Sequence, residues 1–247
     1  MRRRFFVEKF EASSATLRGE AAHHLGRVLR AETGQVYELS DGQHVWLART
    51  ESVKRDEVQF SLIEQLAAPQ VAVRIQLLLA IVKFDRFEWA LEKATELGAE
   101  EIVPLAAERS ERGLLAAAGK RAERWRRILA ESAQQSRRLR IPELKGAAKP
   151  AEAFRAAPAP VKLLLSERPG ARPLREILEP HVSARQAVPA ACIAVAVGPE
   201  GGWTDAEFAA AADCGFAEGA LGHNILRTET AVCAALAAVQ YAFGADE

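Results

Sequence analysis

One glycine-rich segment of the chain has the residue types that most often bind a ligand through backbone atoms. It runs Val197-Gly198-Pro199-Glu200-Gly201-Gly202, leaves an apolar strand and opens a helix, for which Thr204 is a suitable N-cap. In open α/β sheets, ligands bind at the carboxyl ends of strands, where this loop must lie. Glycines expose backbone N–H and C=O groups to a ligand. The pattern is neither a dinucleotide-binding nor a Walker loop, and an ordinary strand-to-helix turn is the alternative.

A second segment, Gly222-His223-Asn224-Ile225-Leu226-Arg227-Thr228-Glu229-Thr230, also follows a short strand and opens a helix. Arg227 and Glu229 stand where that otherwise apolar helix begins. A guanidinium there could stabilise negative charge on a reacting group, and a carboxylate could act as a base. Capping is the alternative, because Glu229 complements the helix dipole and Arg227 can be solvated.

The elements that must position these segments alternate between strand and helix from residue 71 onward. Continuous apolar strands that alternate with helices predict a parallel sheet covered on both faces. The Ala/Pro-rich stretch 147–160 is the least regular part of the pattern. Expected strands are 75–82, 101–105, 161–166, 191–197 and 219–221, and expected helices are 86–97, 119–138, 173–178, 204–213 and 228–243.

The first 68 residues have a different pattern, in which short β-rich runs and one helical run are typical of a small β-barrel with one helix. Asp41-Gly42 is a hairpin-turn signal between two β-rich runs, and 67–70 reads as a linker. The strands are expected at 3–7, 35–39, 45–49 and 58–63, and the helix at 21–30. We therefore predict two domains, 1–68 and 71–247.

Composition indicates a globular cytoplasmic protein without a metal centre. The 247 residues are 49% hydrophobic and 27% charged, and the longest apolar runs have strand length. An early basic stretch is interrupted by Glu8 before any apolar leader region. Cys192, Cys214 and Cys233 lack zinc-ligand spacing, so we expect three small buried thiols in a reducing compartment.

Charge is distributed unevenly although the net charge is zero. Residues 108–145 contain 11 Lys/Arg against 5 Glu, a net of +6, whereas residues 198–247 contain one Arg against 8 Asp/Glu, a net of −7. The basic segment predicts a surface for RNA phosphates, and a solvated helix face explains it equally well. The candidate RNA-binding residues are Arg3, Arg4, Arg27, Arg30, Arg109, Arg121, Arg124, Arg126, Arg127, Arg137 and Arg138. Trp125 lies in the same run and is expected in the core.

The two glycine segments together resemble the knotted SPOUT methyltransferases, and more narrowly the RsmE family of 16S rRNA (uracil-N3)-methyltransferases. The resemblance covers nearly the whole chain. Besides GPEGG and ILRTET, it rests on residues 3–7, 24–25, 28–30, 83, 85–86, 92–98, 108–110 and 134–136. His223-Asn224 departs from the Pro-Arg pair usual in the family, and Arg137 replaces a frequent glycine.

The resemblance implies an α/β fold whose C-terminal domain is a SPOUT trefoil knot with a parallel sheet, preceded by a PUA-like β-barrel that binds RNA. It implies a homodimer, S-adenosyl-L-methionine (SAM) as cofactor, and 16S rRNA of the small ribosomal subunit as partner, with methylation at N3 of a uridine (uridine 1498). SAM is expected to contact Leu165, Ser166, Glu167, Val197, Gly198, Pro199, Glu200, Gly201, Gly202, Leu221, Gly222, Ile225, Leu226 and Thr230.

Uracil N3 carries a proton, so catalysis must remove it and stabilise charge on the base oxygens. Arg227 is the candidate charge stabiliser, and Glu229 the candidate base or a group that orients an arginine. Two alternatives remain at this point: a non-catalytic RNA-binding or ribosome-assembly protein of the same fold, and a SPOUT 2′-O-methyltransferase of rRNA or tRNA.

Overall fold

A computed structural model describes residues 3–68, 71–183 and 191–244 of the chain. The chain divides into two compact units, Met1–Gln70 with Ala133–Ile141, and Val71–Ser132 with Pro142–Glu247. Residues 133–141, which we had assigned to the C-terminal domain, thus cluster with the N-terminal unit. Of the expected linker, residues 69–70 lie outside the described residues.

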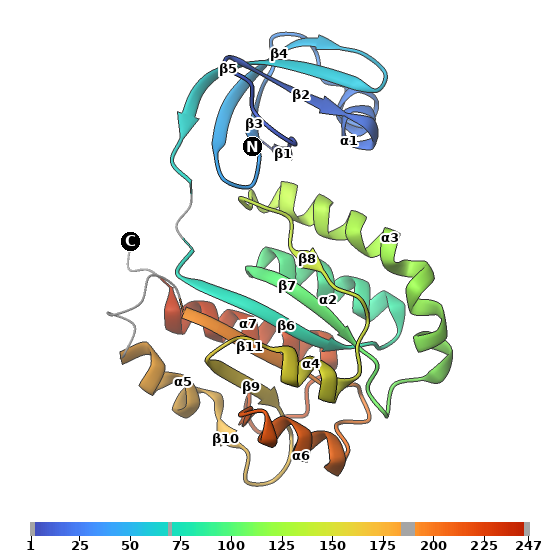
Figure 1. Cartoon of the computed structure of the whole chain (residues 1–247), viewed down its shortest axis with the longest axis vertical. Helices are drawn as coiled ribbons and strands as arrows, with labels where there is room; N and C mark the ends of the chain where they lie inside the picture. The colour runs from blue at the N-terminus through green and yellow to red at the C-terminus, as the bar shows by residue number, and fades with distance from the viewer. Residues whose placement is uncertain (1–2, 69–70, 184–190, 245–247) are drawn as a thin grey trace. The chain divides into compact units, whose positions relative to one another are not determined.

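The N-terminal unit is a curled five-stranded sheet in the order β1-β3-β4-β5-β2 (Figure 1). β1 is parallel to β3 and the other neighbouring pairs are antiparallel. Its ends, β1 and β2, are not paired in the described chain, so the sheet is a half-barrel. The elements are β1 (Arg4–Phe6), β2 (Ser14–Arg18), α1 (Gly19–His23), η1 (His24–Val28), β3 (Val36–Ser40), β4 (Val45–Val53) and β5 (Glu57–Leu66).

Alternating side chains build the core of this unit. Phe5, Leu39 and Phe60 are almost fully buried in one cluster, as period-2 strands with one covered face require. The predicted hairpin turn is present, because Ser40 pairs with Val45 and Gly42 has φ 87°. The expected helix 21–30 is instead a short α-helix that continues as one π-helical segment.

The C-terminal unit contains a seven-stranded sheet in the order β10-β12-β9-β11-β6-β7-β8, and every neighbouring pair is parallel. This confirms the predicted α/β class. The strands are β6 (Val73–Ala80), β7 (Ala99–Leu105), β8 (Glu143–Leu144), β9 (Val161–Leu165), β10 (Arg172–Pro173), β11 (Ala191–Val197) and β12 (Ala217–Ala220). The helices are α2 (Phe84–Glu96), α3 (Arg112–Gln135), α4 (Pro150–Ala156), α5 (Leu174–Ser183), α6 (Asp205–Asp213) and α7 (Thr228–Phe243).

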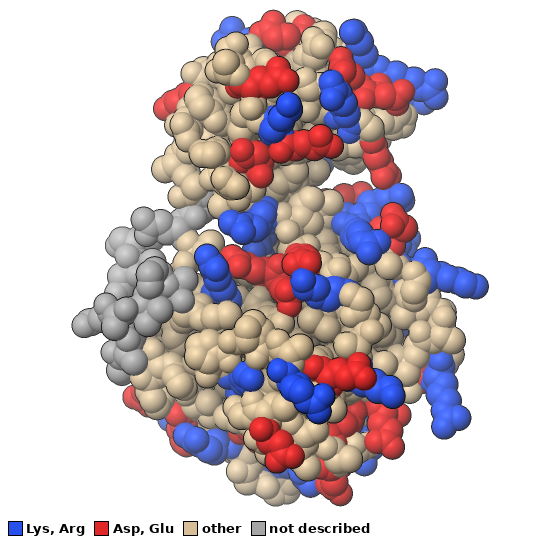
Figure 2. All heavy atoms as spheres, in the orientation of Figure 1, with Lys and Arg blue, Asp and Glu red and all other residues tan. Residues whose placement is uncertain are grey.

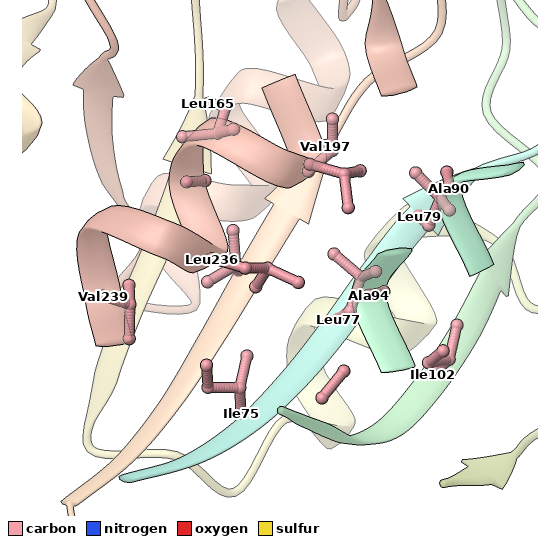
Figure 3. Packing of buried hydrophobic residues seen from close by; sticks show 14 of the residues in the cluster. Ile75, Leu77, Leu79, Ala90, Ala94, Ile102, Leu165, Val197, Leu236 and Val239 are labelled. Atoms are coloured by element: carbon pink, nitrogen blue, oxygen red, sulfur yellow. The ribbon is translucent and has the colours of Figure 1, made fainter. Parts of the chain in front are cut away.

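Both faces of this sheet are covered, which explains the continuous apolar runs. Ile75, Leu77 and Leu79 of β6 face a cluster that includes Leu236 of α7 and residues of α2 (Figure 3). The intervening Leu78 and Ala80 belong to a second cluster with residues of α4 and α6. β6 carries Arg74 and Gln76 near its start and is apolar only from Leu77 onward, whereas β11 is apolar throughout. Burial on both faces therefore fixes the end of β11, which can position the loop that follows it.

The structure differs from the expected pattern at two helices. The stretch 147–160 is not irregular: Pro150 begins α4, where its fixed φ suits the first turn, and Phe154 is fully buried. α3 begins at Arg112, earlier than expected. Trp125 is 2% exposed and packs on Phe84 and Phe87, as predicted for a core residue.

Candidate functional site

A cavity of about 520 Å³ lies at the carboxyl ends of β9, β11 and β12. Three loops line it: the loop after β9 (165–171), the glycine loop after β11 (defined here as 197–204) and the loop before α7 (221–227, the pre-α7 loop). This edge of a parallel sheet is where ligands bind in open α/β folds, and the volume lies in the range of small-molecule sites, roughly 300–1,000 Å³.

The glycine loop is joined to its neighbours by side chains that bond backbone carbonyls. Trp203 Nε1 donates to the carbonyl of Leu165 at 3.1 Å, and Thr228 Oγ1 donates to that of Gly198 at 3.0 Å. Thr204 and Glu207 form a complete capping box at the start of α6. The loop is therefore fixed at both ends.

Two arginines from other elements contact the middle of the glycine loop. Arg109 Nη1 donates to the carbonyl of Gly201 at 2.8 Å, and Arg86 Nη1 lies 2.6 Å from Glu200 Oε1. Gly202 has φ +68°, and a Cβ there would lie 2.9 Å from Glu167 Oε1. This backbone conformation favours glycine.

The loop after β9 is also held in place. Ser166 Oγ donates to Glu218 Oε1 at 2.6 Å and accepts from the N–H of Arg168. The Arg168 guanidinium lies 2.7 Å from Asp205 and 4.1 Å from the ring centroid of Phe208. These contacts fix the part of the cavity wall that the loop after β9 forms.

The pre-α7 loop is different. Residues 222–225 are exposed, Ile225 to 83%, and within the described ranges no hydrogen bond or ion pair involves residues 221–226. Gly222 has φ +138° with no atom within 4 Å of a Cβ position. His223 and Asn224, the departure from the family pattern, both line the cavity.

The structure brings most of the expected cofactor residues together. All fourteen except Gly201 and Thr230 line the cavity. The sequence analysis missed Arg168, Pro169, Gly170, Trp203, Thr228 and Ala231, which line it as well. A signal was available for Pro169 and Gly170, because they follow a buried strand at the same edge of the sheet.

The two catalytic candidates lie in different surroundings. Arg227, at the N-cap of α7, is exposed, and its side chain has no partner among the described residues. Glu229 is 13% exposed and its Oε1 lies 4.0 Å from Arg86 Nε, while its Oε2 is buried without a hydrogen-bond partner in the described chain. The arginine next to Glu229 is therefore Arg86, and neither Glu229 nor Glu200 pairs with Arg227.

Several predicted RNA-binding arginines are engaged within the protein. Arg4 is 7% exposed and pairs with Glu38 at 2.9 Å, so it differs from the expected surface residue because burial removes its access to phosphate. Arg137 also pairs with Glu38, at 3.7 Å. Arg121 and Arg124 both contact Glu88.

The remaining basic candidates leave a mixed surface. Arg3, Arg27, Arg30, Arg109, Arg126 and Arg127 are exposed, and Arg138 is half-buried. Arg126 contacts Glu123 one turn away along α3. Figure 2 shows basic side chains projecting from the edge where Figure 1 draws α3, with acidic ones among them. The basic surface is therefore less concentrated than the sequence count indicates.

The cysteines are partly exposed rather than fully buried as expected, and all three are free thiols. Burial raises the pKa of the Cys192 and Cys233 thiols, so both stay protonated at neutral pH and are poor nucleophiles. Among the described residues, no group of His, Cys, Asp and Glu is arranged to hold a metal ion. The described helices include none that is long and apolar enough to cross a membrane.

Comparison with known families identifies both units. Residues 69–240 match the model of an RNA methyltransferase domain, and residues 17–63 match that of an RNA methyltransferase PUA domain. The chain is 33% identical to ribosomal RNA small subunit methyltransferase E of Synechocystis over 94% of its own length and 74% of the relative's. It is 32% identical to that of Mycobacterium bovis, covering 95% and 90% of the two chains.

Solved structures agree. A ribosomal RNA small subunit methyltransferase E from Neisseria gonorrhoeae, bound to S-adenosyl methionine, has a TM-score of 0.84 at 30% identity and 98% coverage of both chains. A putative methyltransferase from Legionella pneumophila in complex with SAM has a TM-score of 0.85 at 29% identity and the same coverage.

Proposed function

The chain belongs to the ribosomal RNA small subunit methyltransferase E family, and from this premise we propose that it transfers the methyl group of SAM to N3 of a uridine in 16S rRNA. SAM-dependent methylation of small-subunit rRNA is the coarser statement that the family supports directly. The uracil N3 atom and the position, uridine 1498, come from the family resemblance.

The observation that carries the proposal is the cavity formed by the three loops at the carboxyl edge of the sheet. Its size suits a nucleoside-sized ligand, and the fixed loops offer backbone groups for a purine edge. Glu167 and Glu200 line it, and their carboxylates favour a ligand with a sulfonium and an ammonium group. The residues therefore fit SAM.

SAM supplies an electrophilic methyl group with a good leaving group, so this chain's residues have to position the uracil and control its N3 proton. We assign Arg227 to stabilise the negative charge that spreads over the base oxygens as N3 loses its proton. It stands between Leu226 and Thr228, which line the cavity. Its exposed guanidinium has no partner among the described residues and is available to a substrate. Glu229 suits the role of orienting an arginine better than that of a base, because its Oε2 is inaccessible.

A homodimer is part of the proposal. The solvent-facing side of α7 is apolar: Tyr241 is 93% exposed and the neighbouring Ala237 is exposed too. Trp89 of α2 is 44% exposed. Exposed aromatic residues of this kind are frequent where a second chain binds. The cytoplasm, where ribosomal subunits assemble, is the proposed location and stays a prediction.

The test is a methylation assay with labelled SAM on undermethylated 30S subunits, with free 16S RNA alongside, followed by mass spectrometry of the modified nucleotide. Detection of N3-methyluridine supports the proposal. A 2′-O-methyl product would assign the chain to the ribose-methylating SPOUT enzymes instead. SAM binding with no transfer to either RNA would favour a ribosome-assembly role.

A further inference from the structure

Arg86 lies outside every segment singled out for cofactor binding, yet it contacts two of the acidic residues around the cavity. It stands in the first turn of α2. A cation there is disfavoured by the positive end of the helix dipole, so α2 itself gains nothing from it. Its position needs an explanation from its contacts.

The first contact is with Glu200, the acidic residue of the glycine loop, at 2.6 Å. Glu200 lines the cavity. The side chains of Arg86 and Glu200 are 30% and 42% exposed, so the pair is only partly screened by water. The contact joins α2 to the one charged residue of the loop.

The second contact is with Glu229 in the first turn of α7, at 4.0 Å. Glu229 is mostly buried, and its Oε2 has no hydrogen-bond partner in the described chain. A buried carboxylate needs a nearby cation, and Arg86 is the cation that the described residues supply. Arg86 is thus held from the α7 side while it holds Glu200.

We infer that Arg86 is a positioning residue for the cofactor: anchored by Glu229, it holds Glu200 and with it the glycine loop in the conformation that binds SAM. The inference rests on the cofactor site of the proposed function. Arg86 does not line the cavity. Its effect on SAM must therefore pass through Glu200.

A double-mutant cycle on the full-length protein tests this, with SAM affinity measured by calorimetry. Arg86→Gln should weaken SAM binding about fivefold, the size expected when one partly exposed ion pair is lost. Glu200→Gln should weaken it at least as much, because Glu200 also lines the cavity. In the Glu200→Gln background, Arg86→Gln should have no further effect. With small-subunit RNA as substrate, Arg86→Gln should raise KM for SAM and leave kcat nearly unchanged.

Arg74→Gln is the matched control, because Arg74 is an exposed arginine of β6 whose contact, Glu100 at 3.9 Å, lies away from the cavity. It should leave SAM affinity unchanged. Wild-type affinity in a folded Arg86→Gln protein, or an equal loss in both backgrounds, would overturn the inference. If Arg86→Gln does not fold, Arg86→Lys replaces it in the same cycle, since an ammonium lacks the planar fork of the guanidinium. A wild-type protein that does not bind SAM would instead refute the proposed function.

Discussion

The two glycine-bearing loops of the cavity differ in how firmly they are held. The glycine loop is bonded to four other elements through Trp203, Thr228, Arg109 and Arg86. The pre-α7 loop has no such bond at residues 221–226 in the described chain, and Ile225 is 83% exposed. Both loops lie at the same edge of one sheet, so their position in the fold does not explain the difference.

This difference separates two tasks. A loop that binds a small ligand through its backbone gains affinity when it is already fixed, because no ordering entropy is lost on binding. A loop that meets a large RNA substrate can remain open until the substrate orders it. We therefore expect changes in the glycine loop to act on SAM affinity, and changes at the end of the pre-α7 loop to act on the transfer step.

Arg227→Ala should have the largest effect and is the sharpest test of that division. It should reduce the single-turnover methylation rate about 100-fold or more, because a stabiliser of developing charge is lost. SAM affinity, measured by calorimetry, should stay near wild type. Arg227→Lys should recover little, because an ammonium lacks the planar fork of the guanidinium.

If Arg227 has a structural role instead, the opposite effects on SAM affinity and transfer rate are expected. A structural role requires lost stability and weaker SAM binding in Arg227→Ala, with the rate at saturating SAM preserved. Thermal unfolding followed by circular dichroism distinguishes the two. A folded variant with a near wild-type single-turnover rate would end the catalytic assignment.

Gly202→Val should weaken SAM binding roughly 10- to 100-fold, since a β-branched residue at φ +68° costs about 1–3 kcal/mol or moves the loop. Gly215→Val is its matched control: Gly215 has φ +80°, follows α6, and has no atom within 4 Å of a Cβ position. Both variants should lose stability by similar amounts. Equal SAM affinities in the two would show that the fixed backbone of the glycine loop is not what binds the cofactor.

Reversing charge on α3 should separate RNA binding from SAM binding. The double variant Arg126→Glu/Arg127→Glu should bind RNA about tenfold more weakly at low salt, and the slope of log affinity against log salt should flatten by about 2. SAM affinity should not change. If neither the RNA affinity nor its dependence on salt changes, the arginines on this face of α3 contact solvent and not RNA.

The sequence predicted the parallel sheet because a strand covered on both faces must be apolar, as β11 is throughout and β6 is from Leu77 onward. It also predicted the cavity edge, since loops that follow buried strands converge there. α4 escaped prediction because prolines flank a helix of only seven residues, too short to show a clear apolar period, and the burial of Phe154 shows which side chain anchors it. The trefoil knot came from resemblance and not from periodicity.

The charge contacts could not be predicted. Arg4 pairs with Glu38 across 34 residues, and Arg86 meets Glu200 across 114. Local pattern carries no signal for partners so distant in sequence. Counting charges therefore overestimated the free basic surface and missed Arg86, for the same physical reason: an arginine's role depends on which carboxylate the fold brings beside it.

Thr228→Val should give the smallest effect and acts on the bond between the glycine loop and the first residue of α7. Thr228 is 4% exposed, lines the cavity and donates to the carbonyl of Gly198. Valine has nearly the same shape but lacks the hydroxyl donor, so the partly buried carbonyl of Gly198 loses its partner at a cost of about 1 kcal/mol. We expect a melting temperature lower by about 2–4 °C and SAM binding about threefold weaker, because the fixed loop gains freedom that binding must then remove.

Thr95→Val is the matched control for that substitution. Thr95 is fully buried in α2 and donates its hydroxyl to the carbonyl of Leu91 at 2.8 Å, away from the cavity. It should lower the melting temperature by a similar amount and leave SAM affinity unchanged. If both variants keep wild-type SAM affinity, the Thr228 bond only stabilises the fold. The glycine loop must then be held in its binding conformation by its contacts with Arg86 and Arg109. If both variants weaken SAM binding equally, SAM affinity follows the global stability of the fold. The difference in how firmly the two loops are held would then have no bearing on cofactor binding.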